Sequence, residues 1–337
     1  MRAAMMDAMV GDDQYGEDPT VNELERQAAH LLGKEAAVLV ASGTMGNLSA
    51  LLAHCGRGDE AIVGDESHIL WYESGGASTL GGIPLFTVHN DAGGRLDPVA
   101  VGNAIRESRP GYPRTGVVCL ENTQNRCGGA VLSIEDMRAV ADVAYARGVP
   151  VHLDGARIFN AAATLGVSAA DIAAEVDSVQ FCLSKGLGCP IGSLVVGSAE
   201  FIGKVRSQRK ILGGAMRQSG IIAAAGLVAF ETMIQRLPED HARAQRLADG
   251  LRAIKGIEID HGGARSNIVV FKVADAGGDH TGFIEDLKRR GLLVSNYGLR
   301  GVRMVTHYQA DDASITFALD TVAAAMADRE ILANAHA

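Results

Sequence analysis

Residues 149–186, "VPVHLDGARIFNAAATLGVSAADIAAEVDSVQFCLSKG", indicate the fold of this chain. They join two short apolar runs, "VPVHLD" (149–154) and "SVQFCLS" (178–184), through a longer stretch of helical period. Nearly continuous hydrophobic strands that alternate with helices are typical of a mostly parallel sheet covered on both faces. The stretch therefore predicts one strand-helix-strand unit of an α/β sheet.

The same alternation continues along the chain. Further apolar runs with the length of buried strands lie at 36–41, 60–64, 84–88, 116–122 and 191–197. Candidate helices lie between the runs, at 44–55, 97–108, 134–147 and 198–209. The predicted fold class is α/β, a three-layer domain with a mostly parallel sheet.

The pattern changes after a long helical stretch around residues 218–250. The later part of the chain predicts strands at 266–273, 292–298 and 302–307, with helices near 280–290 and 311–330. These elements predict a smaller C-terminal α+β domain. We therefore expect an N-terminal arm over 1–16, a large domain over 17–236 and a small domain over 237–337.

Composition narrows the class of partner. The 337 residues are 47% hydrophobic and carry a net charge of −9 without a long Lys/Arg run, which argues against nucleic acid or an anionic membrane as the main partner. Acidic residues near the N-terminus do not fit a signal peptide, so we expect a cytoplasmic protein. Five widely spread cysteines without a CxxC pair suggest neither a disulfide framework nor a thiolate zinc site, and no metal is expected.

Polar residues that directly follow the apolar runs are the candidates for a binding site, because ligands of open α/β sheets collect at the carboxyl ends of the strands. In "SGTMGN", Gly43 and Thr44 lie at a predicted helix N-terminus, where free N–H groups favour a phosphate. An ordinary helix cap is the alternative for this motif. Asp154 and Arg157 follow the 149–154 run, and a buried ion pair is their alternative.

Lys185 directly follows the 178–184 run and gives these candidates a common chemistry. A lysine is rarely placed at the inner end of a buried strand unless its amine is used. A desolvated amine can attack a carbonyl and form a Schiff base. An aspartate such as Asp154 suits the ring nitrogen of pyridoxal 5'-phosphate (PLP). Together with the turn at residues 43–44, these residues predict a PLP site in the large domain.

Long motifs of the chain resemble one known family. The segments are "VGDDQYGEDPTVNELE", "SGTMGNLSALLAH", "ENTQNRCGG", "HLDGARIFNAAATLGV", "CLSKGLGCPIGS", "RKILGGAMRQSG" and "VRMVTH". They resemble the low-specificity L-threonine aldolases, which are PLP enzymes of fold type I in the threonine aldolase/β-eliminating lyase superfamily. The resemblance extends over nearly the whole chain.

The resemblance implies roles around the cofactor. Lys185 would carry PLP covalently, and Asp154 would pair with the pyridine nitrogen. Arg157 would lie beside the phenolic oxygen of the ring and contribute to the substrate site. His68 would stack on the ring, and the turn at residues 43–44 would take the phosphate.

The resemblance also implies contacts with substrate and with a neighbouring subunit. Arg303 would bind the substrate carboxylate, a bidentate task that suits a guanidinium. Lys210 and Arg217 would reach the cofactor region of a neighbouring subunit, and Tyr15 would enter the pocket from a partner chain. Such shared sites imply a homo-oligomer, and the family implies a homotetramer.

Two features depart from the family pattern. The family usually has "ENTHN" where this chain has "ENTQN", and the amide of Gln124 cannot act as a general base. We expect Gln124 to orient a water or the substrate hydroxyl, and His68 or a bound water to take the proton. The family also has a short "SDTVTxP" segment before "MRAAM", with a serine that helps to bind the substrate carboxylate. Either the N-terminal arm is truncated here or the enzyme does without that contact.

The implied reaction is retro-aldol cleavage of L-threonine, L-allo-threonine and related β-hydroxy-α-amino acids to glycine and an aldehyde. Two alternatives stay open. Another fold type I reaction on PLP, such as β-elimination, would use the same lysine and aspartate. A catalytically weakened PLP-binding homologue would bind the cofactor without turnover.

Overall fold

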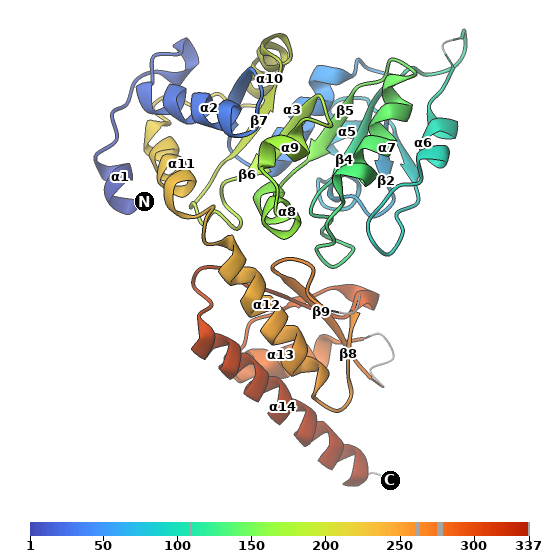
Figure 1. The fold of residues 1–337 in the computed structure, drawn as a ribbon, viewed down its shortest axis with the longest axis vertical. Helices are drawn as coiled ribbons and strands as arrows, with labels where there is room; N and C mark the ends of the chain where they lie inside the picture. The colour runs from blue at the N-terminus through green and yellow to red at the C-terminus, as the bar shows by residue number, and fades with distance from the viewer. Residues whose placement is uncertain (108, 261–262, 275–278, 336–337) are drawn as a thin grey trace. The chain divides into compact units, whose positions relative to one another are not determined.

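The computed structural model describes residues 1–107, 109–260, 263–274 and 279–335 (Figure 1). The chain divides into two compact units, Met1–Gln235 and Arg236–Ala337. Each unit has its own sheet, so each is described by itself.

The first unit is built on a seven-stranded sheet in the order β1-β7-β6-β5-β4-β2-β3. Its strands are β1 (Ala36–Val40), β2 (Glu60–Gly64), β3 (Leu85–Val88), β4 (Thr115–Glu121), β5 (Val151–Asp154), β6 (Ser178–Cys182) and β7 (Ser193–Gly197). The pairings from β3 through β6 are parallel, whereas β7 is antiparallel to both of its neighbours. The predicted mostly parallel sheet is confirmed.

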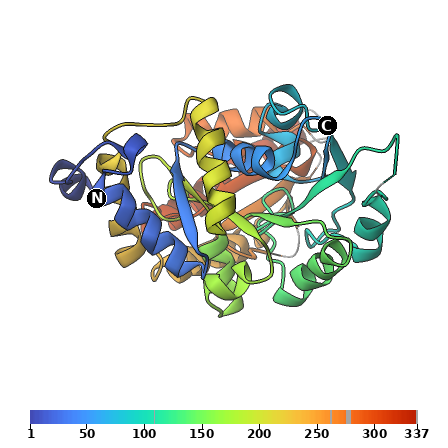
Figure 2. The ribbon, with the colours of Figure 1, turned by 90° about the horizontal axis from the view of Figure 1, so that it is seen from above.

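Helices cover this sheet on both faces. The first unit contains the helices α1 (Arg2–Met6), η1 (Asp13–Tyr15), α2 (Pro19–Leu31), α3 (Gly43–His54), α4 (His68–Trp71), α5 (Gly76–Thr79), α6 (Pro98–Ala104), α7 (Ile134–Tyr145), α8 (Ile158–Leu165), α9 (Ala169–Ala173), α10 (Ala199–Ile211) and α11 (Gly220–Thr232). Figure 2 shows α2 and α10 on opposite sides of β1. The predicted helix over 97–108 ends at Ala104, and residue 108 lies outside the described residues.

Helix α3 packs closely on the sheet. Ser42 caps it, with its side chain accepting a hydrogen bond from the N–H of Met45. A Cβ at Gly43 would lie 2.9 Å from the sulfur of Cys182, and one at Gly46 would lie 2.6 Å from Gln180 Cγ. The two glycines therefore let the first turn of α3 pack directly on β6.

The second unit is a four-stranded antiparallel sheet in the order β10-β11-β9-β8, with helices packed on it (Figure 1). Its elements are α12 (Leu237–Arg252), β8 (Ile257–Ile259), β9 (Ile268–Val273), α13 (Thr281–Arg289), β10 (Ser295–Asn296), η3 (Gly298–Arg300), β11 (Val302–Val305) and α14 (Asp312–Ala335). Buried side chains such as Leu251, Phe271 and Phe283 form its core. The predicted smaller α+β part is confirmed.

The helical stretch expected around 218–250 consists of two helices, α11 and α12, and Pro238, which lacks an N–H for a continuous helix, lies in the first turn of α12. One predicted element is wrong in extent. The strand expected over 292–298 is only the two residues of β10. Gly298 and Gly301 have φ values of +59° and +108°, and they form a tight turn that ends the pairing with β11.

Among the described residues, no single helix has both the length and the apolar character needed to cross a membrane. Only α11 and α12 meet these criteria, and they do so only when counted together.

Candidate active site

Three neighbouring strands end at one edge of the large sheet. Glu121 of β4 is in register with Asp154 of β5, which is in register with Gln180 of β6, and both pairings are parallel. The N–H of Gly155 continues the ladder by donating to Gln180 O at 2.8 Å. The polar residues that follow these strands are thereby brought together.

Asp154 is a buried carboxylate, with 2% of its surface exposed. Its Oδ2 accepts a hydrogen bond from Asn47 Nδ2 of α3 at 2.9 Å, and its Oδ1 accepts one from the N–H of Ala156 at 3.1 Å. Because carboxylate oxygens accept more than one bond each, Asp154 keeps capacity for a further donor. A protonated ring nitrogen is a donor of this kind.

Lys185 lies three residues beyond the end of β6 and is half-buried. Its positive charge partly offsets the rise in the pKa of His68, so the two side chains lie within electrostatic range of each other. The first turn of α3 packs against Cys182, the last residue of β6. The candidate phosphate site at Gly43 and Thr44 therefore lies at the same end of the sheet as Lys185.

His68 is the first residue of α4 and is held at two points. Its main-chain N–H donates to Glu121 Oε2 at 2.7 Å, and its Nδ1 is hydrogen-bonded to Glu73 Oε1 at 2.9 Å. Burial lowers the pKa of His68, but the Glu73 hydrogen bond and the charge of Asp154 together raise that pKa above its usual value. The ring orientation is fixed through Nδ1, so Nε2 is the nitrogen that can exchange a proton with a ligand.

Two buried glutamates were missed by the sequence analysis. Glu73 is 5% exposed and contacts both His68 and Asn47, while burial raises its pKa. Glu121 accepts the N–H groups of His68 and Asn125, and burial and the Asp154 charge raise its pKa to about 7. The signal for Glu121 was its place at the end of an apolar run, which is the same signal that selected Asp154.

Gln124 follows β4 and is 1% exposed. Its Nε2 donates to Glu66 O at 2.7 Å, and its Oε1 accepts from the N–H of Cys127 at 2.7 Å. Both polar ends of this amide thus bind main-chain groups of the surrounding loops.

Arg157 occupies the N-cap position of α8, three residues after Asp154, and is half-buried with its Nε inaccessible to solvent. A buried carboxylate, a lysine and a guanidinium at the strand ends, with a capped helix N-terminus beside them, fit a cofactor that has a basic ring nitrogen and a phosphate. The residues present therefore fit PLP. The ligand atoms of His68, Glu73 and Asp154 also lie within 4.8 Å of one another, as in a metal site, and hydrogen bonds to Nδ1 and Asn47 explain this proximity.

The residues expected near a neighbouring subunit form a second, exposed group. Arg217 pairs with Asp12 at 2.6 Å, and its guanidinium carbon lies 5.9 Å from the ring centre of Tyr15. Tyr15 is 68% exposed. Lys210 lies in the last turn of α10 and is also exposed. The structure thus brings Tyr15 and Arg217 together within one chain.

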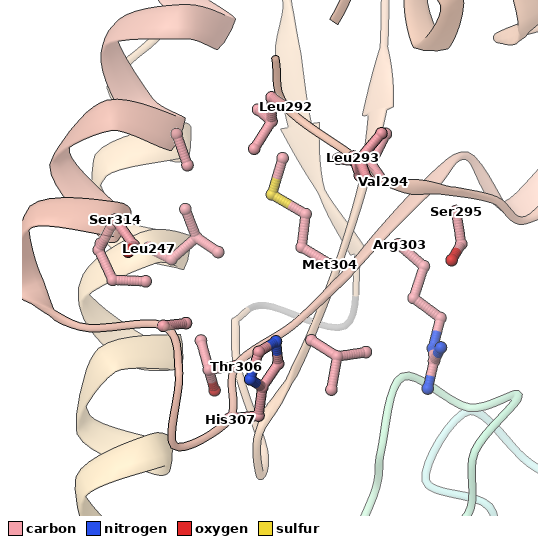
Figure 3. Close-up of a pocket in the computed structure, with 14 residues that line it drawn as sticks. Leu247, Leu292, Leu293, Val294, Ser295, Arg303, Met304, Thr306, His307 and Ser314 are labelled. Carbon is pink, nitrogen blue, oxygen red and sulfur yellow. The ribbon is translucent and has the colours of Figure 1, made fainter. Parts of the chain in front are cut away.

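Arg303 belongs to the second unit, in β11, opposite Ser295 of β10 and Val270 of β9. Its guanidinium carbon lies 5.8 Å from the ring centre of Tyr297. It lines a cavity of about 390 Å³ whose other walls include Leu292 and Met304. Figure 3 shows the Arg303 side chain extending away from these apolar neighbours, so its charged end is directed out of the apolar part of the cavity.

The sequence model of the β-eliminating lyase family matches residues 1–274. The chain is 43% identical to low-specificity L-threonine aldolase 1 of Arabidopsis thaliana over 331 residues, which cover 97% of this chain and 92% of that protein.

Solved structures share the fold. Threonine aldolase of Leishmania major superposes with a TM-score of 0.78 at 20% identity, covering 94% of this chain and 92% of that one. A serine palmitoyltransferase of S. paucimobilis, solved with PLP and myriocin bound, superposes with a TM-score of 0.76 at 20% identity, covering 97% and 82%.

Proposed function

The chain belongs to the PLP-dependent β-eliminating lyase family, and from this premise we propose that it cleaves L-threonine and L-allo-threonine to glycine and acetaldehyde. The resemblance to threonine aldolases found in the sequence is confirmed by the 43% identity to an aldolase of that name. The observation that carries the proposal is the buried Asp154 carboxylate, placed at the strand end next to the one that leads to Lys185. PLP, when bound, draws electrons from the bond that breaks at the substrate Cα.

We assign the residues around PLP as follows. Lys185 would hold the cofactor covalently, and Asp154 would accept a charge-assisted hydrogen bond from the protonated ring nitrogen. Gly43 and Thr44 would bind the phosphate with main-chain N–H groups of the first α3 turn. Arg157 would donate to the phenolic oxygen.

His68 is the proposed base for the β-hydroxyl proton. Glu73 accepts from Nδ1, which leaves Nε2 as the proton acceptor when the ring is neutral. The raised pKa of His68 means that a larger fraction of the imidazole is protonated at neutral pH. The base is therefore expected to gain activity as pH rises through that pKa.

A substitution at Gln124 tests whether this position influences the substrate hydroxyl. We expect Gln124→His to change the ratio of kcat/KM for L-threonine and L-allo-threonine by roughly tenfold, because an imidazole can take a proton that an amide cannot. Kinetics on both substrates would measure it. Gln124→Ala is the matched control, since it removes the same two main-chain contacts without adding a base. An unchanged ratio in Gln124→His would show that this position does not influence the hydroxyl.

Arg303 is the proposed ligand of the substrate carboxylate. Arg303→Lys should raise KM for L-threonine about tenfold and Arg303→Ala up to roughly a hundredfold, because a single ammonium cannot replace a bidentate guanidinium. Steady-state kinetics would measure both values. Arg246→Ala on α12 is the control, because Arg246 is an exposed arginine of the same unit that bonds Thr316. Equal KM values for the Arg303 variants and the parent would rule the role out.

A homotetramer with shared active sites is also proposed. In support, α1 packs on α11, and exposed apolar side chains lie on α1, on the segment that follows it and on α11: Met6, Met9, Val10 and Ile221. Exposed apolar groups of this kind are typical of subunit interfaces. Tyr15, Lys210 and Arg217 would act in the neighbouring site. Light scattering should give four times the 35.2 kDa protomer mass, and a monomer would contradict shared sites.

A cytoplasmic location stays a prediction. All five cysteines are free and buried, which supports a reducing compartment. Cell fractionation would test it.

Product analysis separates the proposed reaction from its nearest alternative. With L-threonine and added PLP, the proposal predicts equal amounts of glycine and acetaldehyde. Elimination on the same cofactor would give ammonia and a 2-oxo acid. Bound PLP without any product would instead indicate a homologue that has lost catalysis.

A further inference from the structure

A single side chain of α3 connects the two carboxylates that face the candidate cofactor site. Asn47 is 1% exposed, and its Nδ2 donates to Asp154 Oδ2 at 2.9 Å and to Glu73 Oε1 at 2.8 Å. The amide nitrogen has two hydrogens, so both are used. Since these partners are acceptors, the Asn47 amide can lie in only one of its two orientations.

This orientation of the Asn47 amide determines which ring nitrogen of the neighbouring His152 carries the proton. Asn47 Oδ1 lies 3.2 Å from Nε2 of His152, and a carbonyl oxygen only accepts, so His152 carries its proton on Nε2. His152 is fully buried, and burial lowers its pKa to about 3, so the ring is neutral. Its Nδ1 then accepts from the hydroxyl of Ser178 at 2.9 Å.

The chain of hydrogen bonds extends one residue further. The Ser178 hydrogen is used toward His152, so His54 Nε2 must donate to Ser178 Oγ, at 2.8 Å. Burial lowers the pKa of His54 to about 4, and its ring stacks on Phe201 with centroids 4.3 Å apart. Every donor from His54 to Asn47 therefore points toward Asp154.

We propose that Asn47 is a positioning residue of the PLP site, and that the chain from His54 through Ser178 and His152 holds its amide in place. This inference rests on the proposed function and adds a residue to it. Asn47 holds the Asp154 carboxylate in the orientation needed for the ring nitrogen. Through Glu73 it also fixes the ring of His68, so one amide sets both the electrostatic partner of PLP and the orientation of the base.

The need for such a residue follows from the charges nearby. Glu73, Glu121 and Asp154 are all buried at this edge of the sheet, and the charge of Asp154 raises the pKa of both glutamates. The hydrogen-bond donors aligned toward Asp154 offset the repulsion between these carboxylates. They do so without adding a positive charge that would compete with the ring nitrogen for Asp154.

The test is a pH titration of the absorbance of bound PLP in the holoenzyme, together with the Kd for PLP. Asn47→Ala should shift the titration midpoint by about one pH unit and weaken PLP binding about tenfold, the effect expected for one lost hydrogen bond to a charged group. Ser49→Ala is the control. It lies on the same helix, and its buried hydroxyl has no hydrogen-bond partner among the described residues, so neither quantity should change.

A second variant keeps the test decisive if Asn47→Ala does not fold. Asn47→Ser retains one donor and should give a smaller shift in the same direction. A folded Asn47 variant with the parent midpoint and the parent Kd would overturn the positioning role. Failure of the parent protein to bind PLP would instead overturn the proposed function, so the two results are distinguishable.

Discussion

Replacing Lys185 with alanine is expected to abolish turnover of L-threonine, with kcat falling by at least about 10³-fold. The reason is that the amine is the proposed covalent attachment point and also a proton-transferring group, and loss of such a group costs roughly 10²–10⁴-fold. Glycine release measured with saturating PLP would give the value. Lys185 is half-buried, so alanine removes little packing and the fold should persist.

A matched lysine controls for nonspecific effects. Lys204 lies on α10, pairs with Glu200 at 2.8 Å and is exposed, so Lys204→Ala should retain full activity. Turnover by Lys185→Ala within tenfold of the parent rate would contradict the assignment of the lysine.

Asp154→Asn is expected to lower kcat by about 10²–10³-fold, the range for losing one preorganised electrostatic group. An amide of the same shape cannot carry the negative charge that keeps a ring nitrogen protonated. The same variant removes the charge that helps to raise the pKa of Glu121. The pKa of Glu121 should therefore fall, which NMR or infrared titration of the carboxyl would detect in the cofactor-free protein.

Asp249→Asn is the control for this substitution. Asp249 is an exposed carboxylate of α12 that bonds Gln245 and Arg252, and its loss should leave kcat unchanged. Parent-like kcat in a folded Asp154→Asn protein would show that the charge is not needed.

Local patterns in the sequence predicted the strand ends and the residues that follow them. Asp154 and Lys185 stood out because polar groups directly after buried apolar runs are conspicuous. The same patterns carry no information on contacts between distant segments. Asn47 and Asp154 are separated by 107 positions, and only the close packing of α3 on β6 brings them within hydrogen-bonding distance.

The missed glutamate shows a second limit. Glu73 lies in "WYESGG", a polar context that resembles an exposed turn, yet it is buried by its bonds to His68 and Asn47. Burial of a charge depends on partners supplied by other elements, so composition alone gives no sign of it. The length of β10 could not be predicted from hydrophobicity either, because the turn at Gly298 and Gly301 determines where this strand ends.

The most direct test of the central claim is to locate the bound cofactor in the chain. Borohydride reduction of the holoenzyme, followed by proteolysis and mass spectrometry, should place one phosphopyridoxyl group on the peptide that contains Lys185. The group on any other lysine, or on none, would contradict the site built from Lys185 and Asp154.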